Sequence, residues 1–241
     1  MVGALWAQRW ATVVPHEPPP RTATLIDDMA RTLVTGVSGG PSEGGRPYTA
    51  PCMAAPPIAV VVPVKDFTRA KVRLAQHLDA AARAELARDM AGIVLAAAAP
   101  LPVSVVCDDV DVRTWAEAAG ADVIWTPGLG LNGAVQAGVA ELADRGVDTV
   151  VVAHSDLPLA TSLAWVAATP GVTLVPDRRL DGTNVLAVPA AAGFRFSYGA
   201  GSFDRHRAEG LRLALPVRIV RDARLGWDVD HPADLALPAH Y

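Results

Sequence analysis

The chain has 241 residues, of which 51% are hydrophobic, and a formal net charge of −4 at pH 7. A chain of this length can form one α/β domain or two smaller ones, and its apolar content can fill a large core. The acidic balance, with an isoelectric point near 5.8, argues against a general nucleic-acid-binding protein, which would carry a basic stripe. Any anionic ligand would have to be held by local charges and backbone dipoles.

The two cysteines, Cys52 and Cys107, show neither a C-x-x-C motif nor the spacing of zinc ligands. A disulfide framework is therefore not expected, and a reducing cytoplasm is the default location. The apolar stretch from Gly92 to Leu101 is too short and too rich in alanine to span a membrane. These features predict a protein that binds neither nucleic acid nor a membrane.

The first 57 residues differ in composition from the rest of the chain. They contain Pro18-Pro19-Pro20 and the glycine-rich segment Gly39–Gly45, with little hydrophobic periodicity. We expect residues 1–57 to be a disordered extension or an over-long start assignment. Residues 58–241 are expected to form one domain.

From Ile58 onward, short β-branched apolar runs alternate with amphipathic segments rich in alanine and leucine. The predicted strands are Ile58–Val62, Val103–Cys107, Asp122–Trp125, Thr149–Ala153, Val172–Val175, Val185–Val188 and Val217–Val220. The predicted helices are Ala80–Ala98, Val112–Ala119, Asn132–Asp144, Ser162–Ala168 and Phe203–Leu213. Asp79 is suited to cap the first helix, and Gly146 to end the third.

This alternation predicts a three-layer α/β/α domain built on a mixed, mainly parallel sheet, because its strands are apolar on both faces. In such sheets the ligand lies at the carboxyl ends of the strands. Most of the polar residues considered below follow predicted strands, which favours a single shared site.

A cationic segment follows the first predicted strand. It carries four cations within nine residues, namely Lys65, Arg69, Lys71 and Arg73, and it is not a Walker A loop because it contains no glycine. A solvated basic helix start is the simpler alternative, but cations at a helix amino end oppose the helix dipole unless an anion is bound. The pattern therefore predicts that Lys65, Lys71 and Arg73 contact phosphate.

Carboxylates follow two other predicted strands. Asp156 comes three residues after the end of the strand at Ala153, and Asp230 lies near the end of the chain with Asp228 two residues before it. Carboxylates at such strand ends are typical magnesium ligands in nucleotide enzymes. Alternatively, Asp156 caps the following helix and Asp230 caps a short terminal helix in which Pro232 is near the first position.

Two polar, glycine-bearing turns flank the strand Val185–Val188. The first reads Gly182-Thr183-Asn184, and the second, Gly199-Ala200-Gly201-Ser202, opens into a charged helix. Glycine lets a backbone approach an anion closely, and the first turn of a helix points unpaired N–H groups toward it. The turns are therefore a candidate anion pocket, although similar turns also occur without a ligand.

Asn132 opens a predicted helix after the turn Pro127–Gly130. Its side chain suits either helix capping or a contact with the base or ribose of a nucleotide.

In this order, the motifs resemble those of the guanylyltransferases that activate a three-carbon phosphoacid in the biosynthesis of the deazaflavin coenzyme F-420. These are the phosphoenolpyruvate and 2-phospho-L-lactate guanylyltransferases, and the resemblance runs from about Ile58 to Leu237. The most specific motifs are Gly182-Thr183-Asn184 and Gly199-x-Gly201-Ser202-Phe203-x-x-His206, whereas the terminal motif Asp228-x-Asp230-x-Pro232-x-Asp234-Leu235 is shared more widely among nucleotidyltransferases.

The resemblance implies a nucleotidyltransferase that transfers GMP from GTP to phosphoenolpyruvate, or alternatively to 2-phospho-L-lactate or 3-phosphoglycerate. It implies Mg²⁺ as the cofactor and the next enzyme of the pathway as a possible partner. It implies that Lys65, Lys71, Arg73 and Asp156 act in catalysis and that Asp156 and Asp230 bind the metal. It also implies that the nucleotide is bound by Lys65, Lys71, Arg73 and Asn132, and the acceptor by Thr183, Asn184, Gly199, Gly201 and Ser202.

Three positions depart from the family's pattern. Asp181 stands where glycine is common, Ala200 where proline is common and His231 where threonine is common. Two alternatives remain, namely another nucleotidyl- or sugar-transferase on the same architecture and a nucleotide-binding module without catalysis.

Overall fold

The computed structural model of this protein describes residues 57–236, so the predicted extension lies outside the described residues except for Pro57. Its strands are β1 (Ile58–Pro63), β2 (Val103–Cys107), β3 (Asp122–Trp125), β4 (Thr149–Ala153), β5 (Val172–Pro176), β6 (Thr183–Pro189) and β7 (Val217–Ile219). Its α-helices are α3 (Ala80–Ala97), α4 (Val110–Ala118), α5 (Gly130–Asp144) and α6 (Ser202–Arg212). Short 3₁₀ helices are η1 (Phe67–Arg69), η2 (Val72–Leu74), η3 (Ala164–Ala167), η4 (Ala190–Ala192) and η5 (Pro232–Leu235).

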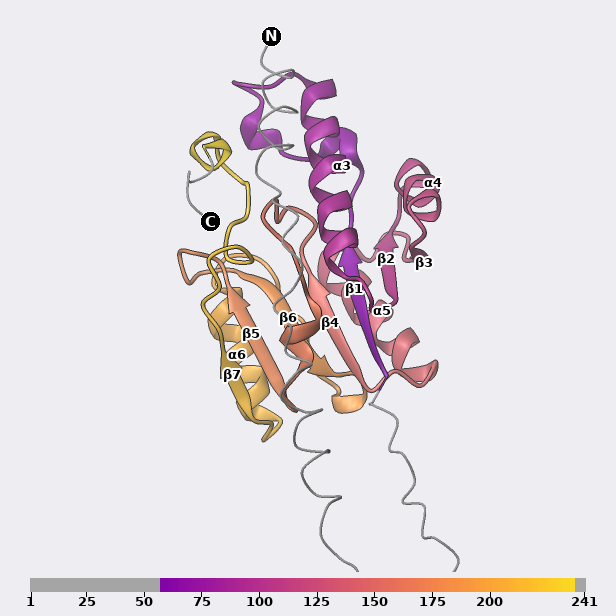
Figure 1. Ribbon diagram of the computed structural model, residues 1–241, viewed down its shortest axis with the longest axis vertical. Coiled ribbons are helices and arrows are strands. Elements are labelled where there is room, and N and C mark those ends of the chain that lie inside the picture. The colour runs from indigo at the N-terminus through magenta and orange to yellow at the C-terminus, as the bar shows by residue number, and fades with distance from the viewer. Residues whose placement is uncertain (1–56, 237–241) are drawn as a thin grey trace, which may run out of the picture. The chain divides into compact units, whose positions relative to one another are not determined.

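The strands form one seven-stranded sheet in the order β3-β2-β1-β4-β6-β5-β7. Strand β6 is antiparallel to both of its neighbours, β4 and β5, while the other pairs are parallel. The mixed, mainly parallel sheet is therefore confirmed (Figure 1). Because β6 runs in the opposite direction, its first residue, Thr183, lies at the same edge as the carboxyl ends of the other strands.

Helices cover both faces of the sheet and complete the predicted three layers. Buried side chains of α3 and α4 pack with Val60 and Val62 of β1 on one face. Buried side chains of α5 pack on the other face with Ala59 and Val61, and α6 contacts β5, β6 and β7. The alternation along β1 follows from the period of two in a strand and explains why its residues are apolar on both sides.

Most predicted boundaries agree with the structure within two residues. Asp79 caps α3 by accepting a hydrogen bond from the backbone N–H of Ala82, and Gly146 follows the last turn of α5 with φ of +86°, as predicted. The prediction of a helix over Ser162–Ala168 is wrong, because only the 3₁₀ helix η3 forms there. The buried residue Leu163 donates its N–H to the carbonyl of Ala97, at the end of α3, and Pro170 follows Leu163 by seven residues. These two constraints leave room for only a short helix.

A buried polar cluster joins β6 to α6. The hydroxyl of Ser202 accepts a hydrogen bond from the N–H of Thr183 at 3.0 Å. His206 Nε2 accepts one from the N–H of Ser197 at 2.9 Å, so its Nδ1–H donates to the Thr183 hydroxyl at 3.0 Å. The imidazole of His206 is therefore neutral and fully buried. Burial, with the neighbouring His154 and Arg205, lowers its pKa to about 4.

No helix in residues 57–236 is both long enough and apolar enough to cross a membrane.

Acid should destabilise the fold through His206. The folded protein has the lower pKa, so the unfolded chain, in which histidine titrates near 6.5, binds the extra proton between about pH 6.5 and 4. The stability contributed by the neutral ring is complete above that window and is lost as the pH falls through it. The free energy of unfolding is measured in urea at pH 7 and at pH 4.5. We expect its decrease between these two pH values to be about 2 kcal/mol smaller in His206→Gln than in the wild type.

His77→Gln is the matched control, because it removes an exposed histidine from the same domain. An equal pH dependence in the wild type, His206→Gln and His77→Gln would contradict the role of the buried imidazole.

Candidate active site

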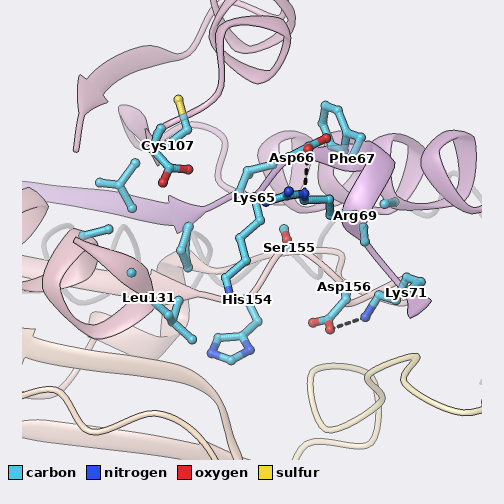
Figure 2. Close-up of a pocket in the computed structure, with 18 of the residues that line it drawn as sticks. Lys65, Asp66, Phe67, Arg69, Lys71, Cys107, Leu131, His154, Ser155 and Asp156 are labelled. Carbon is cyan, nitrogen blue, oxygen red and sulfur yellow. Dashed lines mark hydrogen bonds and ion pairs between the residues drawn. The ribbon is translucent and has the colours of Figure 1, made fainter. Parts of the chain in front are cut away.

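A cleft of about 740 Å³ lies at the carboxyl ends of β1, β2 and β4. Its walls come from the segment after β1, the ends of β2 and β4, the amino end of α5, Gly199 and Asp230 (Figure 2). Among the residues predicted to carry function, Lys65, Lys71, Arg73, Asp156, Asp230 and Gly199 line this cleft. The structure therefore brings the predicted phosphate-binding cations and the predicted metal ligands together.

The ammonium of Lys71 joins the two carboxylates. Its Nζ lies 2.6 Å from Oδ2 of Asp156 and 3.2 Å from Oδ1 of Asp230. Arg73 contacts the other oxygen of Asp230 at 3.2 Å. Lys71 has φ of +54°, a left-handed conformation that costs of order 1 kcal/mol for a residue other than glycine. The backbone is thus held in a disfavoured conformation at the residue whose side chain reaches both carboxylates.

Burial and charge oppose each other in this ion pair. Burial alone favours the neutral form of each partner, but the carboxylates of Asp156 and Asp230 outweigh it and raise the pKa of Lys71. Burial likewise pushes the pKa of Asp156 upward, but the charge of Lys71 and its hydrogen bond outweigh it and the net pKa is lowered. Lys71 and Asp156 are therefore both charged at neutral pH.

The C-terminal segment is positioned by its own hydrogen bonds. The N–H of Val229 donates to the carbonyl of Asp156 at 3.2 Å, which places the next residue, Asp230, beside the end of β4. The carboxylate of Asp234 accepts from the N–H groups of Asp230 at 2.9 Å and His231 at 2.7 Å. Arg178, in the β5–β6 turn, pairs with Asp234. Sequence reasoning missed this support, although Asp234 lies in the terminal motif.

The two alternatives in which Asp156 and Asp230 cap helices are not what the structure shows. Asp156 binds Lys71 instead of capping η3, which begins eight residues later. His231 is the N-cap residue of η5, with Pro232 at its first position. The carboxylate of Asp230 is left to face the cleft.

The carboxylate pair suits a divalent cation. Within residues 57–236, the buried Oδ1 atom of Asp156 has no hydrogen-bond partner, although buried carboxylate oxygens are nearly always paired. Asp156 and Asp230 already share one cation, Lys71, which shows that their oxygens converge. The described residues contain no group of three or more His, Cys, Asp or Glu side chains suited to a metal. One or two carboxylates completed by substrate phosphates are what Mg²⁺ commonly uses.

Four other predicted residues serve as internal supports in this structure. Ser202 and Thr183 are buried and bond each other, as described above. The amide of Asn184 donates to the carbonyl of Leu225 at 3.0 Å and so anchors the C-terminal segment. Asn132 Oδ1 accepts from the N–H of Tyr198 at 2.6 Å. The assignment of these residues to substrate or nucleotide stays a prediction.

The prediction that the start of α6 offers unpaired N–H groups to an anion is wrong for three of them. The N–H of Gly201 donates to the carboxylate of Asp181 at 3.0 Å, and that of Phe203 to the Asp181 carbonyl at 3.0 Å. The N–H of Ser202 donates to the carbonyl of Gly199. The carboxylate of Asp181 thus occupies one of these three groups. Gly199, with φ of +111°, is the residue of this turn that lines the cleft.

Arg205 fixes the carbonyl side of the same turn. Its guanidinium donates to the carbonyl oxygens of Ser197 at 2.8 Å and Ala200 at 2.6 Å. The turn is therefore held by an acid on its N–H side and a base on its carbonyl side. Neither role was predicted, because charged side chains near the start of a helix are equally consistent with simple exposure to solvent.

His154 is a further cleft residue that sequence reasoning did not assign. Its ring lies 4.8 Å from that of Tyr198, and its buried Nε2 atom finds no hydrogen-bond partner among the residues that the structure describes. Burial lowers the pKa of His154 below its ordinary value, which keeps the ring neutral. In Figure 2 the side chain of Lys65 extends toward it. Its position two residues before Asp156, at the end of β4, was the available signal.

Comparison with known proteins agrees with this geometry. The family described as "Guanylyl transferase CofC like" matches residues 58–237. The chain is 39% identical over 184 residues to the phosphoenolpyruvate guanylyltransferase of Sphaerobacter thermophilus, covering 73% of this chain and 89% of the relative. It is 37% identical over 180 residues to the protein of the same name in Roseiflexus castenholzii, covering 73% and 84%.

A solved structure supports the fold. A nucleotidyl transferase from Methanothermobacter thermautotroptrophicus superposes with a TM-score of 0.53 at 18% sequence identity, covering 73% of this chain and 93% of that one. The chain has the fold of nucleotidyltransferases and belongs to the guanylyl transferase CofC-like family.

Proposed function

We propose that the protein transfers GMP from GTP to the phosphate of phosphoenolpyruvate, forming enolpyruvyl-diphospho-guanosine and pyrophosphate, in the biosynthesis of coenzyme F-420. The observation that carries this proposal is the convergence of Lys71 and Arg73 on Asp156 and Asp230 in one cleft. The relatives that bear the name phosphoenolpyruvate guanylyltransferase favour this acceptor over 2-phospho-L-lactate or 3-phosphoglycerate.

The reaction needs no general base. The second pKa of a phosphate monoester is about 6, so the acceptor phosphate is mostly a dianion at pH 7. One of its oxygens attacks the α-phosphorus of GTP, and a new P–O bond forms. The bond from the α-phosphorus to the oxygen that bridges to the β-phosphate breaks, and pyrophosphate leaves with the electron pair. This chemistry requires positioning and charge neutralisation in the site, not proton abstraction.

Charge balance in the cleft supports a requirement for Mg²⁺. Its lining contains equal numbers of cationic and carboxylate side chains, which are Lys65, Arg69, Lys71, Arg73, Asp66, Asp108, Asp156 and Asp230. The side chains alone therefore offer no excess positive charge to a triphosphate and a phosphoacid. Mg²⁺ held by Asp156 and Asp230 would neutralise phosphate oxygens where the two anions meet. Lys65, Lys71 and Arg73 would bind the phosphates of the nucleotide.

On this proposal the acceptor lies beside Gly199. Thr183, Asn184 and Ser202 belong to the same corner of the molecule, where the start of β6 meets the start of α6. Gly201 contributes the left-handed backbone, with φ of +71°, that shapes the turn. Asn132 holds the neighbouring segment through the N–H of Tyr198, and on this proposal it would also contact the nucleotide.

The protein would act on GTP and a small phosphoacid in the cytoplasm. Its product is an activated phosphoacid, which requires a following enzyme that attacks the activated group and releases the nucleotide. That enzyme is the partner implied by the chemistry.

An acceptor panel tests the reaction. Purified protein is incubated with GTP and Mg²⁺ and with phosphoenolpyruvate, 2-phospho-L-lactate or 3-phosphoglycerate, and pyrophosphate release is measured. We expect release with all components present and the highest kcat/KM with phosphoenolpyruvate. Pyrophosphate release that does not depend on any acceptor would contradict the proposal, and a preference for another acceptor would correct the substrate.

Asp156→Asn should lower kcat by roughly 1,000-fold, since removing a metal ligand forfeits several kcal/mol of charge stabilisation. The fold should survive, because Lys71 keeps its contact with Asp230. Activity is measured with saturating Mg²⁺, and folding by thermal unfolding. Asp144→Asn, an exposed change at the end of α5, is the control. Near-normal turnover by Asp156→Asn would exclude this carboxylate as a metal ligand.

Ser202→Ala should raise the KM for phosphoenolpyruvate about tenfold while changing the KM for GTP much less. The substitution removes the acceptor of the Thr183 N–H and so loosens the corner beside Gly199. Both KM values are measured well below the unfolding temperature. Equal changes in the two values would move Ser202 to the nucleotide side of the site.

A further inference from the structure

The cleft has two ends that differ in chemistry. Asp156 and Lys71 lie at the end near β4, whereas Asp108 and Thr126 line it beyond β2 and β3. Strand β1 lies between β2 and β4 in the sheet, so these ends are two strand spacings apart, roughly 10 Å. If the phosphates of a nucleotide occupy the β4 end, its base reaches the end formed by β2 and β3.

The β2–β3 end is mainly apolar. Its walls include Leu131 and Ala134 from α5, and Val106 and Cys107 from β2. Apolar walls with a few fixed polar groups are typical of sites that hold a flat ring. The Thr126 hydroxyl is already used, because it donates to the carbonyl of Cys107 at 3.3 Å.

Asp108 is the carboxylate that this end of the cleft leaves available. The other carboxylates of the lining are engaged: Asp66 accepts from the N–H and the hydroxyl of Thr68, and Asp156 and Asp230 contact Lys71. Asp108 is exposed and makes no hydrogen bond or ion pair with any residue in the described part of the chain. It follows β2 directly, so a rigid strand fixes its backbone.

We propose that Asp108 selects guanine by accepting hydrogen bonds from the N1–H and the exocyclic N2 amino group of the base. This inference rests on the proposed function and names the residue that makes the reaction specific for GTP. A carboxylate accepts hydrogen bonds only, and guanine presents two adjacent donors on this edge. Adenine presents the lone pair of N1 and a C–H there, so a carboxylate would repel it and stay unpaired.

The amino end of α5 supplies the complementary group. Gly130 and Leu131, at the start of this helix, line the same cleft as Asp108, and Leu129, at its N-cap, offers no side-chain hydrogen bond. The first N–H groups of a helix lack partners within it. They suit the O6 acceptor of guanine, which adenine replaces with an amino group.

The test compares GTP, ITP and XTP in the wild type and Asp108→Asn. ITP lacks the N2 amino group, and XTP carries an oxygen in its place. For Asp108→Asn we expect kcat/KM with GTP to fall by about 10- to 100-fold, since a hydrogen bond to a charged group is lost. Activity with XTP should rise, because the amide of asparagine donates to the added oxygen. The KM for phosphoenolpyruvate should stay unchanged.

Asp111→Asn is the matched control, an exposed aspartate in the first turn of α4 that does not line the cleft. It should keep the wild-type order of the three nucleotides. Direct binding of GTP and XTP to each protein, measured by calorimetry without acceptor, gives a readout that does not depend on turnover. In Asp108→Asn the ratio of the two dissociation constants should move toward XTP by at least tenfold.

The outcomes separate the two proposals. Wild-type nucleotide preferences in Asp108→Asn, in both binding and turnover, would overturn the role of Asp108, as would equal losses with all three nucleotides. If the wild type binds GTP but releases no pyrophosphate with any acceptor, the proposed function fails. In that case the binding ratios alone still decide whether Asp108 reads the base.

Discussion

The contact of one ammonium with two carboxylates organises the rest of the site. Lys71, Asp156 and Asp230 come from the segment after β1, the end of β4 and the C-terminal segment, which are far apart in the sequence. Each would be costly to leave unpaired in a partly buried cleft, so the three segments are held together by charge. A cleft that already brings two carboxylates to one cation is suited to bind metal and phosphate at the same point.

The direction of β6 explains how the second half of the cleft forms. Because β6 is antiparallel, Thr183 starts at the edge where β1 and β4 end, and the chain returns to that edge through residues 194–199. Phe194, Phe196 and Tyr198 alternate into the core along this return, and Gly199 emerges at the cleft. His206 then locks the return to β6 with two buried hydrogen bonds.

The sequence predicted the layers, all seven strands and the charged residues that meet in the cleft, because strand periodicity and strand-end carboxylates are local signals. It could not predict which hydroxyls and N–H groups are already paired within the protein. Ser202 reads as a ligand-binding residue, yet its hydroxyl bonds Thr183, and Asp181 takes the N–H of Gly201. Such pairings depend on contacts between residues about 20 positions apart, which a pattern of residue types does not specify. Asp234 was missed as the support of Asp230, although it lies only four residues away, because residue types do not show which N–H groups a carboxylate accepts from.

The central claim is that an acceptor phosphate oxygen attacks the α-phosphorus of GTP in this cleft. It is tested most directly with phosphoenolpyruvate labelled with ¹⁸O in its phosphate group, followed by mass spectrometry of both products. If this oxygen is the nucleophile, we expect a product that joins GMP to enolpyruvyl phosphate and retains all the label, and pyrophosphate without label. Label in the released pyrophosphate, or transfer of the labelled phosphoryl group to a guanine nucleotide, would contradict it.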